Sequence, residues 1–183
     1  MNDAGEALRR LLLQRSVRRG DFLLASGARS SYYIDCRLTT MSAEGMVLVG
    51  RLGWEAIRAA GWRATAVGGL TMGADPVAYA VAAASHGTSL EIDAFSVRKE
   101  AKGHGTGRLI EGNFRAGEEV VIVEDVITSG GSAQRAIAAV EDAGGRVVGV
   151  LALVDREQGG REVLAAGGHS VISMITSTQL GLI

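Results

Sequence analysis

Short apolar runs alternate along the chain with segments whose apolar residues recur at helical spacing. The run at residues 120–123 has no polar alternation, which predicts a parallel strand buried on both faces. Strands and helices that alternate in this way predict an α/β fold with a parallel sheet and helices on both faces. Further strands are predicted at residues 64–67, 90–97, 146–154 and 170–175, and helices at 46–60, 77–85, 133–140 and 161–166.

Turn-forming residues divide these elements. Asp75 and Pro76 suggest a helix N-cap followed by proline at the first helical position. Gly61 can end the helix before it, and the pair at residues 144–145 can end a later one. Residues 16–40 do not follow the alternation, so we expect them to form a small region over the ligand-binding edge of the sheet.

Composition and charge limit the classes of protein. At 183 residues the chain suits one domain spanning 1–183, and a net charge of −1 argues against a nucleic-acid partner. Cys36 is the single cysteine, which excludes an intrachain disulfide and a cysteine-based zinc site. The first 15 residues form a poor signal peptide, and no segment reaches the roughly 20 apolar residues of a membrane span. A cytoplasmic protein without a membrane partner is therefore expected.

Two adjacent carboxylates, Glu124 and Asp125, follow the apolar run at residues 120–123. Ligands of open parallel sheets bind beyond the carboxyl ends of the strands. The hydroxyl- and glycine-rich residues 128–132 come next and can offer N–H groups and a helix N-terminus to an anion. A sugar phosphate fits both features, since its hydroxyls donate to the carboxylates while the loop holds the phosphate. A purely structural strand, turn and helix with an acidic exit is the alternative.

Two further polar clusters follow predicted strands. Residues 98–107 combine four groups that are or can become cationic with three glycines, which suits a loop that closes over a charged phosphate ester. The alternative there is a solvated basic turn. Arg156, at the exit of the strand at 146–154, could bind a ligand carboxylate bidentately. The alternative, which the residues by themselves favour, is an internal salt bridge with Asp155 or Glu157.

Residues 120–132 resemble the phosphoribosyl-pyrophosphate (PRPP) motif of the type I phosphoribosyltransferases. Residues 95–112 resemble the catalytic loop of the orotate-specific members, and 154–160 resemble their signature, in which an arginine faces the substrate carboxylate. Residues 21–35 resemble the N-terminal hood over the pyrimidine, and 67–76 the pyrophosphate-binding turn. The five segments stand in family order.

The resemblance implies a type I phosphoribosyltransferase fold with a small hood, and transfer of the phosphoribosyl group of PRPP to orotate. The products would be orotidine 5′-monophosphate and pyrophosphate, in de novo pyrimidine (UMP) biosynthesis. Magnesium would be bound mainly by PRPP, and the protein would be a homodimer whose basic loop reaches the partner's site. The implied PRPP-binding residues are Arg98, Lys99, Lys102, His104, Glu124, Asp125, Val126, Ile127, Thr128, Ser129, Gly130, Gly131 and Ser132, with Thr128 and Arg156 for orotate, and Lys102, His104 and Asp125 as catalytic residues.

Two positions depart from the pattern. Ala25 and Met72 stand where many relatives carry lysines that contact PRPP or its pyrophosphate. Their absence leaves Arg98, Lys99, Lys102 and magnesium to neutralise the pyrophosphate. Two other functions stay open: a phosphoribosyltransferase for another base, and a non-catalytic regulator that senses PRPP or a nucleotide.

Overall fold

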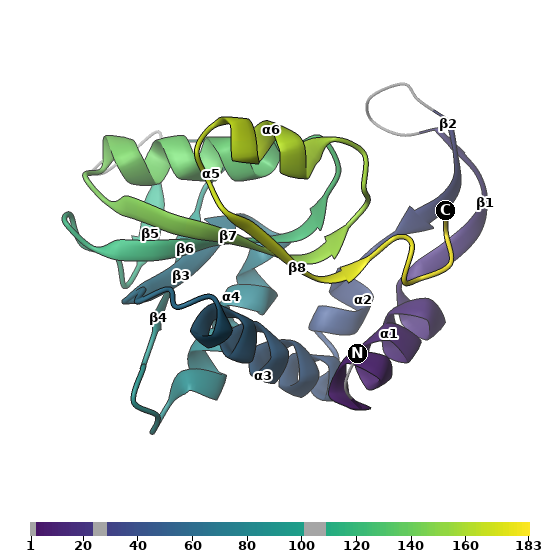
Figure 1. Cartoon of the computed structure of the whole chain (residues 1–183), viewed down its shortest axis with the longest axis horizontal. Helices are drawn as coiled ribbons and strands as arrows, with labels where there is room; N and C mark the ends of the chain where they lie inside the picture. The colour runs from purple at the N-terminus through teal and green to yellow at the C-terminus, as the bar shows by residue number, and fades with distance from the viewer. Residues whose placement is uncertain (1–2, 24–28, 101–108) are drawn as a thin grey trace.

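The structure, a computed structural model, describes residues 3–23, 29–100 and 109–183 and has the predicted α/β architecture (Figure 1). Helices and strands alternate over most of these residues. The helices are α1 (Asp3–Arg15), α2 (Arg37–Thr40), α3 (Ala43–Ala59), α4 (Ala74–Ser85), α5 (Gly131–Asp142) and α6 (Gly160–Ala166). The strands are β1 (Val17–Leu23), β2 (Arg29–Ile34), β3 (Ala66–Leu70), β4 (Asp93–Val97), β5 (Ile110–Gly112), β6 (Glu119–Ile127), β7 (Arg146–Asp155) and β8 (Val171–Thr176).

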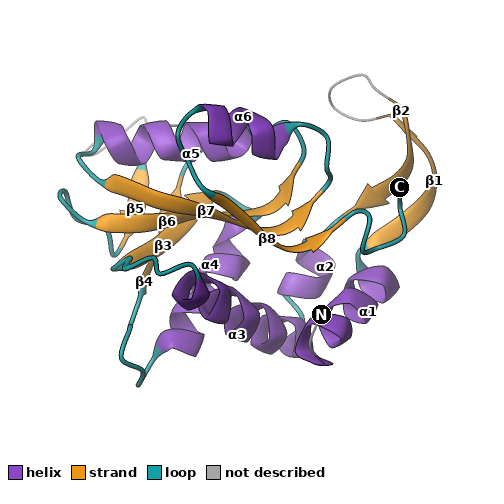
Figure 2. Ribbon diagram, in the orientation of Figure 1, coloured by secondary structure: helices purple, strands orange, loops and turns teal. Residues whose placement is uncertain are grey.

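A six-stranded sheet in the order β5-β4-β3-β6-β7-β8 forms the centre of the protein (Figure 2). Its strands are parallel except β5, which pairs antiparallel with β4 through Phe95 and Gly112. The mostly parallel sheet confirms the expected fold class. The sequence analysis missed β5 because three residues are too few to show a periodic pattern.

Helices cover both faces of this sheet. Figure 2 shows α3 and α4 on one face and α5 and α6 on the other. The side chains of β6 divide between the two layers: Val121 and Val123 join the core under α3 and α4, while Val120 and Ile122 join the core under α5. This two-sided burial is the reason why the strand reads as an unbroken apolar run.

A separate small region lies within residues 16–40, as expected for a hood, and its described strands are β1 and β2. Strands β1 and β2 pair antiparallel in a small sheet of their own, with Val17 opposite Ile34. A backbone bond closes the open end of this hairpin, since Asp35 N donates to Ser16 O at 2.9 Å. The guanidinium of Arg19 donates to Gly181 O at 2.8 Å, so the hairpin lies against the C-terminal segment (Figure 1). We call β1 and β2 the hood.

The predicted start of α4 was wrong. The helix begins at Ala74, its N-cap position is Gly73, and Asp75 and Pro76 are its second and third residues. Both residue types are compatible with these positions, because the first N–H groups of a helix lack intrahelical acceptors and the dipole favours an acid there. Residues 124–127 also extend β6 beyond the predicted strand, because its pairing with β7 continues to Ile127 opposite Asp155.

Candidate active site

The sheet reverses its winding direction between β3 and β6. From β3 the chain proceeds through α4 to β4 on one side, and from β6 through α5 to β7 on the other. Crevices outside the carboxyl ends of strands at such a switch point are the usual ligand sites of open α/β sheets. A Cβ atom on Gly73 would lie 2.5 Å from Oδ1 of Asp125, so the segments after β3 and within β6 meet there.

Unpartnered polar atoms collect at this edge of the sheet. Among the described residues, five buried side-chain atoms have no hydrogen-bond partner, and four belong to Asp75, Arg98, Glu124 and Arg156. Asp75 lies in the first turn of α4, the helix that follows β3, Arg98 directly follows β4, Glu124 is in β6 and Arg156 directly follows β7. Buried polar groups are normally hydrogen-bonded, so exceptions gathered at one edge indicate that a polar ligand binds there.

Glu124 and Asp125 face different environments. Glu124 is 6% exposed. Burial first, and then the negative charge of Asp125, raises the pKa of Glu124 well above its ordinary value. The Asp125 carboxylate is partly exposed and accepts the Val126 N–H at 2.9 Å. Oε2 of Glu124 has no partner, so this pair can accept hydrogen bonds from hydroxyl groups of a ligand.

The loop at residues 128–132 leads into the N-terminus of α5. Gly130 has φ of 84°, a conformation that favours glycine, and no side chain caps the helix at this end. The loop packs on the start of α6, where a Cβ atom on Gly160 would lie 2.6 Å from the Thr128 carbonyl oxygen. The uncapped first turn offers N–H groups and the positive end of the helix dipole to an anion.

Arg156 is buried, at 5% exposure, and lies beneath the hood. Its guanidinium lies 4.6 Å from the ring centroid of Tyr32 and donates from Nη2 to Ser30 Oγ at 3.1 Å. Its Nε has no partner. No carboxylate pairs with Arg156 within the described ranges, and Asp155 instead pairs with Arg161 at 3.1 Å. The internal salt bridge considered from the sequence is thus not formed, and the guanidinium remains available to a ligand.

Sequence reasoning did not single out Tyr32, Ser30 or Arg161. Tyr32 and Ser30 lay within the segment that resembles a hood, but nothing local to them pointed to Arg156. Arg161 carried no signal, because its contact with Asp155 forms only when α6 folds back on the end of β7.

The basic cluster is described only in part. The backbone N–H of Arg98 donates to Leu109 O at 2.8 Å. In its side chain, Nη1 lies 3.6 Å from Oε1 of Glu111. Lys99 is exposed. The remaining predicted members, Lys102 and His104, lie outside the described residues, and so does Ala25.

Met72, the other departure from the family pattern, is 58% exposed in the turn before α4. It lines a hollow together with Asp35 and Arg37. Arg37 pairs with Asp35 through two bonds of 2.8 and 2.9 Å, which lowers the pKa of the Asp35 carboxyl. The cationic side chain of Arg37 therefore lines the same hollow as Met72, the position where the family resemblance implies a lysine in many relatives.

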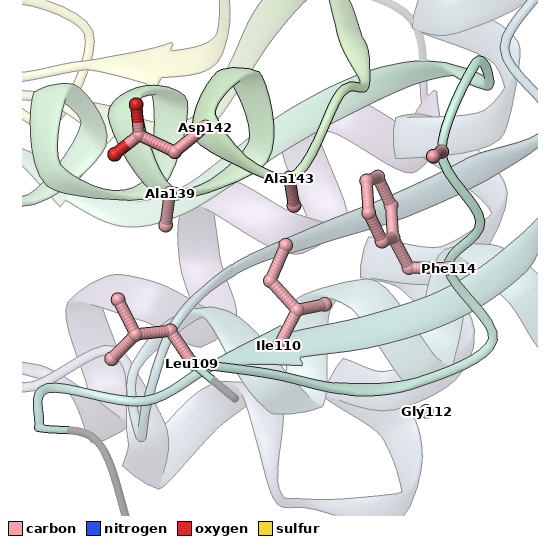
Figure 3. A pocket seen from close by; sticks show the side chains of 8 residues that line it. Leu109, Ile110, Gly112, Phe114, Ala139, Asp142 and Ala143 are labelled. Carbon is pink, nitrogen blue, oxygen red and sulfur yellow. The ribbon is translucent and has the colours of Figure 1, made fainter. Parts of the chain in front are cut away.

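A second hollow, of about 500 Å³, lies between β5 and the C-terminal end of α5 (Figure 3). Phe114, Ile110 and Asp142 are among its lining residues. It lies at the opposite end of α5 from residues 128–132, and a 12-residue helix is about 18 Å long. This hollow is therefore separate from the candidate site.

Comparison with known proteins identifies the class. Residues 42–176 match the family model of the phosphoribosyl transferase domain, and the chain belongs to this family. An orotate phosphoribosyltransferase of Corynebacterium glutamicum (strain R) is 45% identical over 180 residues, covering 98% of this chain and 95% of the relative. One from Aquifex aeolicus is 44% identical over 178 residues, covering 96% of each. Within the family, the chain groups with the orotate phosphoribosyltransferases.

A solved structure agrees with this placement. The orotate phosphoribosyltransferase of Mycobacterium tuberculosis H37Rv in complex with PRPP is 42% identical, with a TM-score of 0.82, covering 99% of this chain and all of that one.

No helix in the described part of this chain is long and apolar enough to cross a membrane. Likewise, residues 3–23, 29–100 and 109–183 contain no group of three or more histidine, cysteine or acidic residues that could hold a metal ion.

Proposed function

We propose that this protein transfers the phosphoribosyl group of PRPP to orotate, giving orotidine 5′-monophosphate and pyrophosphate in de novo pyrimidine biosynthesis. The observation that carries the choice of base is Arg156, a buried guanidinium with a free Nε at the end of β7. Orotate carries a carboxylate on its ring, whereas uracil and the purines do not. The family and the full-length orotate-specific relatives support the same reaction.

Arg156 would bind the orotate carboxylate by charge-assisted hydrogen bonds. Its contacts with Tyr32 and Ser30 restrict the guanidinium before the substrate arrives. Thr128 follows β6, the neighbour of β7 in the sheet, and would contact the same ligand. The pyrimidine would then lie between the hood and the end of the sheet.

The ribose and 5′-phosphate would occupy the switch-point crevice. Glu124 and Asp125 would accept hydrogen bonds from the ribose hydroxyls, and Val126 to Ser132 would surround the phosphate, with the α5 N-terminus directed at it. The family's transition state has oxocarbenium character at the anomeric carbon. Such chemistry depends mainly on positioning the reactants and on stabilising the departing pyrophosphate.

The pyrophosphate would be met by the basic cluster. Arg98 directly follows β4, two strands from β6, and its unpartnered Nε is available to a phosphate oxygen. Lys99, Lys102 and His104 follow in sequence and would add charge as the leaving group departs. Lys102 and His104 are assigned by family resemblance alone.

Magnesium would accompany PRPP and be held largely by the oxygens of PRPP and by water. The site's donors fit this ion, because the carboxylates of Glu124 and Asp125 lie at the crevice and oxygen ligands are those that magnesium prefers. The bound ion would offset negative charge on the pyrophosphate.

The functional unit would be a homodimer. In each chain residues 1–183 would act as one domain, and the protein would be located in the cytoplasm. An exposed apolar surface on α3 and α4 supports the dimer, since Val47 is 70% and Tyr79 49% exposed. These side chains line one hollow with Met46, Gly50, Arg51, Ala80, Ala83 and Ala84. Large apolar patches on a protein surface usually mark interaction sites.

A substrate panel tests the proposal. Consumption of orotate in the presence of PRPP and magnesium is followed by ultraviolet absorbance, beside uracil and adenine at equal concentration. We expect turnover of orotate and no turnover of uracil or adenine. Preference for uracil or adenine would identify a phosphoribosyltransferase for another base, and PRPP binding without turnover of any base would favour the regulatory alternative.

A further inference from the structure

Asp155, the last residue of β7, is a carboxylate with 2% exposure. Its Oδ1 accepts the Glu157 N–H at 2.8 Å, and its Oδ2 accepts Nε–H of Arg161 at 3.1 Å. Arg161 donates in addition from Nη2 to Ser173 Oγ on β8 at 2.8 Å. A buried charge is costly unless it is paired and hydrogen-bonded, and these contacts compensate for the burial of Asp155.

The bond from Asp155 to the Glu157 N–H closes a turn whose middle residue is Arg156. A carboxylate that accepts the N–H two residues further on is a common way to fix a turn. Glu157 has φ of 57°, in the left-handed region that residues other than glycine rarely adopt. Such a conformation persists where surrounding contacts impose it. Here Oε2 of Glu157 also accepts the Thr178 N–H at 2.7 Å.

The backbone on both sides of this turn is held by the sheet. Arg156 N donates to Ile127 O at 2.9 Å, and Ser177 N donates to Asp155 O at 2.9 Å. Together with the bond from the Glu157 N–H to Oδ1 of Asp155, these bonds hold the main chain on both sides of Arg156. Beyond the turn, the guanidinium meets Tyr32 and Ser30 of the hood.

Both carboxylate oxygens of Asp155 bind groups other than the Arg156 guanidinium. Asp155 therefore forms no ion pair with the guanidinium of Arg156. We propose that Asp155, whose charge is held by Arg161, is a positioning residue that orients Arg156 toward the substrate carboxylate. This inference rests on the proposed function, in which Arg156 binds orotate. Affinity for a planar carboxylate depends on such orientation, because a guanidinium that is already aligned loses less freedom on binding.

The variant Asp155→Asn tests this role. Asparagine retains the size and a carbonyl oxygen for the Glu157 N–H but lacks the charge that pairs with Arg161. We expect the KM for orotate to rise about tenfold, while the KM for PRPP changes less than about twofold. In an Arg156→Ala background the same substitution should change the orotate KM by less than about twofold, because its effect passes through Arg156.

A second pair of variants covers the case in which Asp155→Asn does not fold. Arg161 is 42% exposed in its side chain, so its replacement is tolerated more easily. Arg161→Gln should raise the orotate KM, and Arg161→Lys, which restores the charge, should recover most of the loss. Glu162→Gln is the matched control, since it changes the charge of an exposed neighbour on α6. Thermal melts accompany each variant.

The possible outcomes separate the two proposals. If Arg156→Ala raises the orotate KM but Asp155→Asn leaves it unchanged, the positioning role alone is overturned. Equal rises in both KM values, or full additivity with Arg156→Ala, would also overturn it, because Asp155 would then support the sheet in general. An Arg156→Ala variant with normal orotate KM would overturn the role of Arg156 and this inference with it.

Discussion

Gly73 makes room for the carboxylate of Asp125. A Cβ atom at Gly73 would lie 2.5 Å from Oδ1 and 2.6 Å from Oδ2 of Asp125, distances that no packed methyl group tolerates. The backbone of Gly73 is helical, with φ of −65° and ψ of −41°, so alanine is compatible with its conformation. Glycine is therefore required here for the space that the acid occupies.

Gly73→Ala should displace the Asp125 side chain and leave the fold intact. We expect the KM for PRPP to rise about tenfold, because displacing a positioned group is costly for binding and catalysis. The melting temperature should stay within a few degrees of the wild type. Steady-state kinetics and a thermal melt measure the two effects.

Gly69→Ala provides the contrast for Gly73→Ala. Its Cβ would lie 2.1 Å from the Val123 carbonyl oxygen, a backbone atom that cannot rotate away. We expect this variant to lose about 1–3 kcal/mol of stability through overpacking. If Gly73→Ala lost as much stability as Gly69→Ala, the idea that only a side chain must move would be wrong.

The raised pKa of Glu124 predicts how stability depends on pH. Between the ordinary value of 4.5 and its raised pKa, the folded chain binds more protons at this group than the unfolded chain does. Its contribution to stability is therefore fully present below 4.5 and is lost as the pH rises through the raised pKa.

Glu124→Gln should remove this loss of stability at higher pH, because a glutamine side chain does not ionise. In the absence of ligand, the variant should melt higher than the wild type at about pH 8, and the difference should shrink toward about pH 5. Glu118→Gln, an acid near the start of the same strand, is the control. A difference in melting temperature that is independent of pH would contradict the assignment.

Arg156→Ala should chiefly weaken orotate binding. Removing one partner of a buried, hydrogen-bonded charge pair costs about 2–5 kcal/mol. Arg156→Lys keeps the charge but loses the planar fork, so it should fall between alanine and the wild type. The KM for PRPP should change much less in both variants. Intact orotate affinity with weakened PRPP binding would show that Arg156 serves the other substrate.

Activity should require a divalent metal. The substrate is rich in phosphate, and the sequence has Met72 and Ala25 where the family resemblance implies lysines in many relatives, so we expect the ion to offset more of the negative charge. Chelation should abolish turnover, and added magnesium should restore it. Full activity in chelator, with the absence of metal verified by elemental analysis, would refute the requirement.

A mixed dimer tests whether subunits share their sites. Lys102→Ala and Asp125→Asn homodimers should each be nearly inactive. If residues 98–107 serve the partner's site while Asp125 serves its own, a mixed dimer contains one intact site and one site with both defects. Equal amounts after random reassortment should recover about a quarter of wild-type activity.

Subunit exchange in the mixed-dimer experiment is checked with a tagged chain. Confirmed exchange without recovered activity would place the basic segment in its own subunit's site. Lys102→Ala alone should leave the melting temperature nearly unchanged, which separates a loss of catalysis from a loss of folding.

Local sequence predicted the site elements that are contiguous and rich in one kind of chemistry. The acidic pair lies in the last part of β6, the loop at 128–132 follows β6 and Arg156 follows β7, and parallel strands bring these ends to one edge. The surroundings of Arg156 were beyond reach, because Ser30 lies 126 positions away and meets it only after the hood folds over the sheet. The start of α4 was misread because Asp75 and Pro76 suit several positions of a first helical turn.

Each of the strands β3, β4, β6 and β7 is followed by, or contains, one buried polar atom that lacks a partner. A ligand that bonds to these atoms links the ends of four strands and favours the folded chain by mass action. At about a hundred times its dissociation constant, such a ligand adds about 2.7 kcal/mol of stability. Proteolysis of transiently opened chains follows the open population when reclosing is fast. The lifetime of this protein in a cell should therefore lengthen when its substrates are abundant.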